Sequence, residues 1–112
     1  MAVDKSGNIW FTEWLVSKIG KLNPSTGKIT EYALPSPGYE PYELAVDVED
    51  TVWVAGFLSN KIARLDSAKG TFVEYPIPNP RTEIRKMAAD PKQGIWWAES
   101  HTDTIGHIVV KR

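Results

Sequence analysis

The segment Ile9-Trp10-Phe11 returns as Val52-Trp53-Val54 and again as Ile95-Trp96-Trp97, so that a tryptophan recurs every 43 residues. A fixed period of this length is typical of repeat proteins, in which each repeat folds as one small unit. An aspartate keeps the same spacing, and so do many other residue types, which makes chance an unlikely explanation of the pattern. The recurring residues include Asp4, Asp47 and Asp90, Lys18 and Lys61, Leu22 and Leu65, Gly27 and Gly70, and Glu31-Tyr32 and Glu74-Tyr75.

Each repeat reads as four short strands. Residues 51–55, 61–65 and 71–75 are runs of β-branched and aromatic residues separated by turn residues, and residues 43–46 lead into them. Prolines cross the junctions between repeats and break any helix there, so we expect almost no helix. Four short antiparallel strands repeated every 40–50 residues or so are typical of a propeller blade.

The predicted fold class is therefore all-β: a β-propeller segment of about three four-stranded antiparallel blades. Counted by the repeat, the units are residues 1–46, 47–89 and 90–112, and the last lacks its outer strand. The strand around each repeated tryptophan shows no polar alternation, so we expect these indoles to lie in the core between blades. A closed ring needs about four to eight blades, so this segment is an incomplete ring on its own. Each end blade would expose an apolar face, which predicts self-association to complete a propeller, or a longer parent chain.

Composition excludes several partners and chemistries. The 112 residues are 42% hydrophobic, with 13 basic and 14 acidic side chains and a formal net charge of −1, so we expect neither a nucleic-acid partner nor a membrane. The chain has no cysteine, which excludes disulfides and thiolate chemistry. No signal-peptide pattern, nucleotide-binding loop or nucleophile elbow is present, and the compartment stays open.

Four segments recur in fixed order and resemble the blade pattern of the streptogramin lyase family, also called virginiamycin B lyases. They are Asn8-Ile-Trp-Phe-Thr-Glu13, Ser17-Lys-Ile-Gly-Lys-Leu22, Gly27-Lys-Ile-Thr-Glu-Tyr32 and Leu34-Pro-Ser-Pro37. The match spans essentially the whole chain. The resemblance implies a seven-bladed ring that opens the ester ring of a cyclic depsipeptide by elimination. It also implies Mg²⁺ as cofactor, a Glu-Pro-His segment before an innermost strand, and a second histidine on a neighbouring blade.

Here the matching segment reads Glu40-Pro41-Tyr42, and the next blade offers Glu83-Ile84-Arg85. Glu40 matches the carboxylate on the metal side, whereas Tyr42 stands where the family has histidine. A phenol ionises only near pH ~10 and is a poor substitute for imidazole as a base. We therefore expect a module that binds a small molecule, a peptide or another protein and is catalytically incomplete alone. The alternative is a Mg²⁺-dependent C–O lyase that acts in a full ring.

Two sets of loops in a propeller open on one face, those from strand four to strand one and those from strand two to strand three. His101 lies in such a loop and could act as acid or base if a carboxylate orients it; otherwise it is an exposed polar residue. Trp14, Phe57 and Ser100 share one repeat position, where the two aromatic rings either stack on a ligand or, as we favour, pack on the blade. We expect Lys18 and Lys61 to pair with fourth-strand carboxylates. The candidate catalytic residues are Glu40, Tyr42 and His101, the candidate ligand-binding residues are Glu13, Trp14, Glu83, Arg85 and Glu99, and the candidate metal ligand is Glu40.

Overall fold

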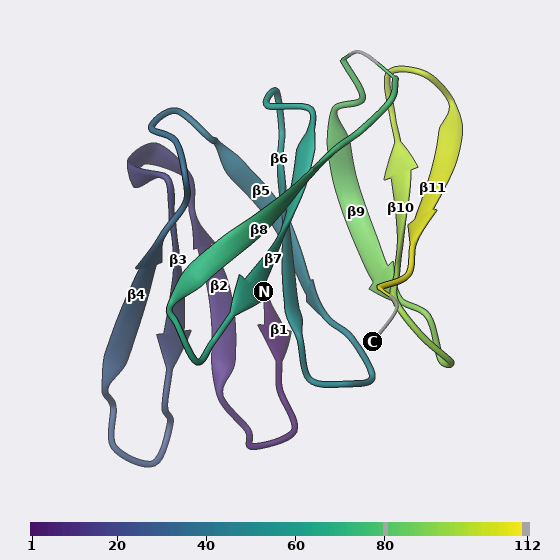
Figure 1. Cartoon of the computed structure of the whole chain (residues 1–112). Coiled ribbons are helices and arrows are strands. Elements are labelled where there is room, and N and C mark those ends of the chain that lie inside the picture. The colour runs from purple at the N-terminus through teal and green to yellow at the C-terminus, as the bar shows by residue number, and fades with distance from the viewer. Residues whose placement is uncertain (80, 111–112) are drawn as a thin grey trace.

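The structure, a computed structural model, describes residues 1–79 and 81–110. Three antiparallel sheets stand side by side, and the second lies between the other two (Figure 1). The strands of each sheet follow one another in chain order, as in a propeller blade. The first blade holds β1 (Ala2–Val3), β2 (Ile9–Glu13), β3 (Lys18–Leu22) and β4 (Ile29–Ala33); the second holds β5 (Pro41–Val46), β6 (Val52–Gly56), β7 (Lys61–Asp66) and β8 (Thr71–Pro76); the third holds β9 (Ile84–Ala89), β10 (Ile95–Glu99) and β11 (Thr104–Ile108).

This arrangement confirms the predicted all-β propeller segment, and the sheets do not close into a ring (Figure 1). Among the described residues the third blade has three strands, β9, β10 and β11. The repeat boundaries after residues 46 and 89 fall inside the second and third sheets, because β5 and β9 pair with the strands that follow them. Residues 111 and 112 of the third repeat lie outside the described part of the chain.

Helical structure is confined to one short turn. The 3-10 helix η1 (Trp14–Val16) joins β2 to β3, and residues 1–79 and 81–110 contain no α-helix. It follows that no described helix is long and apolar enough to cross a membrane.

The core lies between the blades. One buried cluster joins the first blade to the second around Trp10, and the other joins the second to the third around Trp53. Trp10 is 4% exposed and Trp53 is fully buried, which confirms the prediction for these two indoles. The prediction is wrong for Trp96, which is 42% exposed, because the described residues place neither a fourth strand nor a further blade over it.

The repeated aspartate explains how each tryptophan is held. In every blade the indole N–H donates to the carboxylate six residues earlier, and the second carboxylate oxygen accepts backbone N–H groups of the turn between the first two strands. The bond ties the core residue to the turn that precedes its strand. The distances are 2.9 Å for Trp10 with Asp4, 2.8 Å for Trp53 with Asp47 and 2.6 Å for Trp96 with Asp90.

Adjacent blades are also linked at the corner between their second and third strands. Ser17 and Asn60 occupy equivalent repeat positions, and both have left-handed backbone, with φ of 53° and 59°. The Ser17 Oγ accepts from the backbone N–H of Tyr39 at 2.9 Å, and the Asn60 Oδ1 accepts from that of Thr82 at 3.1 Å. These bonds fix the junction segments immediately before β5 and β9.

The recurring lysines pair as expected with carboxylates of the fourth strand. Lys18 Nζ lies 3.6 Å from Glu31 Oε1, and Lys61 Nζ lies 3.5 Å from Glu74 Oε2. All four side chains are partly exposed, so each pair contributes only about 0–1 kcal/mol. The pairs are therefore a regular feature of the blade and not a basic binding stripe.

Candidate functional site

Most of the predicted site residues gather where β2, β6 and β10 end and where β5 and β9 begin. Within each blade these ends lie together, because Pro41 pairs with Gly56 and Ile84 with Glu99. Contacts between side chains then connect this end of the first blade to the second and the second to the third. The site is thus a product of three segments that are far apart in the sequence.

Three aromatic rings form its centre. The Trp14 and Tyr42 rings meet edge to face, with centroids 5.4 Å apart and an interplanar angle of 74°. The Phe57 ring lies 5.9 Å from Trp14 and 5.2 Å from Tyr42. The guanidinium carbon of Arg85 lies 5.3 Å from the centroid of Phe57. We call Trp14, Tyr42, Phe57 and Arg85 the aromatic platform.

Local backbone structure places these side chains. Trp14 begins η1 directly after β2, and Phe57 follows β6 at the equivalent repeat position. The backbone N–H of Phe57 donates to the carbonyl oxygen of Glu40 at 2.9 Å, which holds the segment before β5 against the end of β6. Tyr42 is the second residue of β5, and it is 42% exposed. The backbone that carries the platform is therefore held in place, while the rings stay partly exposed to solvent.

Glu40 and Glu83 share an uncommon conformation. They occupy equivalent repeat positions just before β5 and β9, with φ of 53° and 49°. Left-handed backbone is uncommon for residues other than glycine, and such strain is concentrated at functional sites. In both blades it turns the chain into the innermost strand beside the platform.

His101 is paired with a carboxylate. From the sequence, we expected an acid or base role for His101 only if a carboxylate orients its ring. Its Nδ1 lies 3.5 Å from the Glu83 Oε2, which also contacts Arg81 at 3.5 Å. The Ser100 hydroxyl donates to the carbonyl oxygen of Glu83 at 2.6 Å, which holds the two loops together. An imidazole, a carboxylate and a guanidinium thus lie in one chain of contacts on the third blade.

Glu99 is occupied by contacts within the chain. It is 4% exposed, and its oxygens accept hydrogen bonds from Asn79, Trp97, Thr102 and Thr104 at 2.6–3.1 Å. Burial tends to raise the pKa of this carboxyl, but the four hydrogen bonds outweigh it and the pKa is lowered. The ionised carboxylate holds together the loop that carries His101.

Glu13 lies apart from the platform. It ends β2 in register with Lys18, on the face of the first blade that looks away from the second. Burial, with the neighbouring Glu31 carboxylate, raises the pKa of Glu13, although Lys18 opposes the shift. Its Oε1 is buried without a hydrogen-bond partner among the described residues. The structure thus brings together Trp14, Tyr42 and Arg85, and separately Glu83 and His101, but not Glu13.

The family resemblance implied Mg²⁺ with Glu40 as its ligand. Among residues 1–79 and 81–110, no group of three or more histidine, aspartate or glutamate side chains is placed to hold a metal ion. Mg²⁺ keeps several water ligands and is usually bound by only one or two carboxylates. A magnesium site at Glu40 therefore stays a prediction.

From the sequence we favoured a packing role for Phe57, and the structure places its ring at the centre of the platform. It contacts Trp14, Tyr42 and Arg85, so it connects all three blades. The signal was its repeat position, which it shares with Trp14. Its contact with Arg85 could not be found from the sequence, because it depends on how the third blade is rotated relative to the second.

Known proteins show the same fold. No protein-family model matches the chain, and neither does any curated protein sequence. A streptogramin B lyase structure is 34% identical, with a TM-score of 0.87 over 96% of this chain and 35% of its own. Virginiamycin B lyase from Staphylococcus aureus is 29% identical, with a TM-score of 0.87 over 96% of this chain and 36% of its own.

A catalytically inactive form of that Staphylococcus aureus enzyme, solved with quinupristin, is 24% identical, with a TM-score of 0.82 over 98% of this chain and 40% of its own. The chain thus spans between a third and two fifths of the length of these structures. The three sheets, their order and these likenesses together show that the chain has a virginiamycin B lyase-like β-propeller fold.

Proposed function

We propose that this chain is the ligand-binding part of a β-propeller, and that the aromatic platform is its binding site. The observation that carries the proposal is the convergence of Trp14, Tyr42 and Phe57 from two blades with Arg85 from a third. Four side chains from separate segments meet at the open end of the sheets, where propellers commonly bind ligands.

The chemistry of the platform indicates the class of ligand. The partly exposed rings offer flat apolar surface and favour another ring or an apolar side chain stacked on them. Arg85 carries several N–H donors beside that surface and suits a carbonyl or carboxylate. A small molecule or cyclic peptide with an aromatic group next to backbone carbonyls meets both requirements. A streptogramin B depsipeptide such as quinupristin is of this class.

One feature favours binding over catalysis. Tyr42 packs edge to face on Trp14 and against Phe57, so it serves as part of an apolar surface.

Titration of quinupristin followed by calorimetry tests the proposal. Tyr42→Ala should weaken binding about twofold to tenfold, the equivalent of about 0.5–1.5 kcal/mol for one aromatic contact. Arg85→Ala should also weaken it. Val73→Ala is the matched control, because Val73 is 41% exposed but lies on β8, away from the platform. Equal affinities for wild type, Tyr42→Ala and Arg85→Ala would refute the assignment, and so would absence of binding by the wild type.

The alternative function is the C–O lyase activity that the family resemblance implied. It is favoured by one observation, the His101 imidazole paired with Glu83 at 3.5 Å. A base would remove the proton from the carbon next to a carbonyl while the ester C–O bond breaks, leaving an alkene and a carboxylic acid.

No atom is lost in that step, so the product is a linear isomer of the same mass. Chromatography with tandem mass spectrometry of quinupristin incubated with the chain and Mg²⁺ would detect it. Formation of the isomer by the wild type but not by His101→Ala would support lyase activity. Unchanged quinupristin would rule out lyase activity and leave ligand binding as the function.

A further inference from the structure

Two apolar repeat positions are buried in the first two blades and uncovered in the third. Ile19 is 0% exposed and Ile62 is 1% exposed, whereas their equivalent, Ile105, is 74% exposed. The tryptophans follow the same rule, as described above. Ile19 and Ile62 are covered by the next blade and by a tyrosine of the fourth strand, whereas the described residues place neither over Ile105. The third blade therefore leaves uncovered, on one face, side chains that are buried in the first two blades.

The strand register shows which face of each sheet is directed toward the preceding blade and which toward the following blade. Trp53 and Ile62 belong to the cluster shared with the third blade, so their side of a sheet faces the following blade. Val54 belongs to the cluster shared with the first blade, so the opposite side faces the preceding one. The following face of the third blade, fixed by pairing with Trp96 or Ala98, comprises Lys86, Ala88, Trp96, Ala98, Ile105 and His107. The leading face of the first blade lies on the side of Ile9 and Phe11. The register gives it the apolar residues Val3, Ile9, Phe11, Gly20, Leu22 and Ile29, with Glu13, Lys18, Glu31 and Ala33 toward one end.

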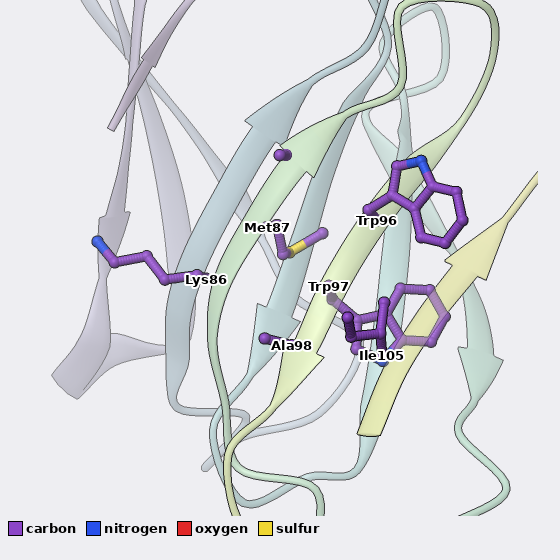
Figure 2. A pocket seen from close by; sticks show the side chains of 7 residues that line it. Lys86, Met87, Trp96, Trp97, Ala98 and Ile105 are labelled. Carbon is purple, nitrogen blue, oxygen red and sulfur yellow. The ribbon is translucent and has the colours of Figure 1, made fainter. Parts of the chain in front are cut away.

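The following face is apolar and hollowed. A shallow hollow of about 240 Å³ is lined mainly by Ala88, Trp96, Ala98 and Ile105. Figure 2 shows Trp96 on β10 and Ile105 on the neighbouring β11 at this hollow. Its one cation among the lining residues is Lys86. Inside the chain, the equivalent surface around Trp10 is filled by Val52 and Val54 of the next blade.

We propose that a second copy of this chain covers this face, with its leading face docked on the following face of the first copy. The argument is continuity with the two interfaces already present. Ile9 and Phe11 of the second copy hold the repeat positions of Val52 and Val54, the residues that cover Trp10. The Phe11 ring lies over Gly20, where the absence of a side chain leaves room for it. The same contact made in both directions closes two copies into one ring of six blades, within the range of about four to eight that propellers use.

Sedimentation of the purified 112-residue chain gives the first test. One chain has a mass of 12.5 kDa, and the proposal predicts twice that value. Ile105→Glu places a carboxylate on the following face, and Val3→Glu, at a residue 63% exposed, places one on the leading face. Each variant should sediment as a single chain. Val73→Glu is the control, since it puts the same charge on an exposed strand position of the middle blade, and it should keep the doubled mass.

Mixing the two variants tests the head-to-tail geometry. The Ile105→Glu copy keeps a native leading face and the Val3→Glu copy keeps a native following face, so the mixture should recover a two-chain species that neither variant forms alone. Ala98→Glu and Ile29→Glu repeat the experiment on the same two faces, and circular dichroism confirms that each variant folds. A wild type of single-chain mass would overturn the proposal. Loss of association in only one of the two variants would show a contact of like faces instead.

Discussion

Ile62 and Ile105 allow a covered and an uncovered site to be compared at the same repeat position. Both lie on the third strand of a blade opposite an alanine, Ile62 opposite Ala55 and Ile105 opposite Ala98. Ile62 is 1% exposed and belongs to the cluster shared with the third blade, whereas Ile105 is 74% exposed. Replacing each by alanine removes the same atoms, so any difference comes from what covers the side chain. For Ile62 this is the third blade together with Tyr75 of the fourth strand, and the described part of the third blade has no such strand beside Ile105.

The expected magnitudes follow from burial. Ile62→Ala removes three buried carbons, worth about 2.4 kcal/mol at about 0.8 kcal/mol each, and leaves a cavity that adds to the loss. We expect its free energy of unfolding to fall by about 3 kcal/mol. Ile105→Ala removes exposed atoms and should change it by no more than about 0.5 kcal/mol.

Urea denaturation followed by tryptophan fluorescence measures both variants, in solution dilute enough for a single-chain mass. With an m value of about 1–3 kcal/mol per molar, the loss for Ile62→Ala lowers the midpoint by at least about 1 M. Ile19→Ala, at a residue with no exposure, should resemble Ile62→Ala. Equal losses for Ile62→Ala and Ile105→Ala in the dilute sample would refute the view that stacking between blades provides the core.

Two further predictions concern the carboxylates that hold the turns and loops. Asp47→Ala should lower the free energy of unfolding by about 2–4 kcal/mol, because it leaves the buried Trp53 indole N–H without its 2.8 Å acceptor. Asp90→Ala should lower it by about 1 kcal/mol or less, because water reaches the exposed Trp96. The urea midpoints of the two variants compare these losses, and similar losses would contradict the reasoning. Glu99 has a lowered pKa because its hydrogen bonds outweigh burial, so it stabilises the fold above its ordinary pKa of 4.5 and loses that contribution as the pH falls further. The urea midpoint of the wild type should therefore drop more steeply below about pH 4.5 than that of Glu99→Gln, and parallel curves would show that Glu99 has no such role.

Much of the fold could be predicted because the repeat is written in local sequence. The spacing of Trp10, Trp53 and Trp96, with short β-branched runs between turn residues, predicted the sheets and their strands. The pairing of Lys18 with Glu31 and of Lys61 with Glu74 followed from neighbouring strands of one hairpin. Such features depend on residues close in sequence, and hairpin geometry fixes their register.

The candidate site was predictable only in part. The sequence named Trp14, Tyr42 and Arg85, and loop order placed them at one end of the sheets. It favoured a packing role for Phe57 and gave no sign that Glu99 would be enclosed by four hydrogen-bond donors. These outcomes depend on side-chain directions in separate blades, which no spacing along the chain records.

The sequence by itself determined the four-stranded unit, its repetition and the faces of each strand, because a period of two along a strand and a period of 43 along the chain are local properties. Only the tertiary structure decided which equivalent residues are buried. Trp53 and Trp96 have the same aspartate, the same indole hydrogen bond and the same strand position, yet one is fully buried and the other is 42% exposed. Burial is a relation between one sheet and its neighbour, and so the stacking of blades sets both the core and the aromatic platform.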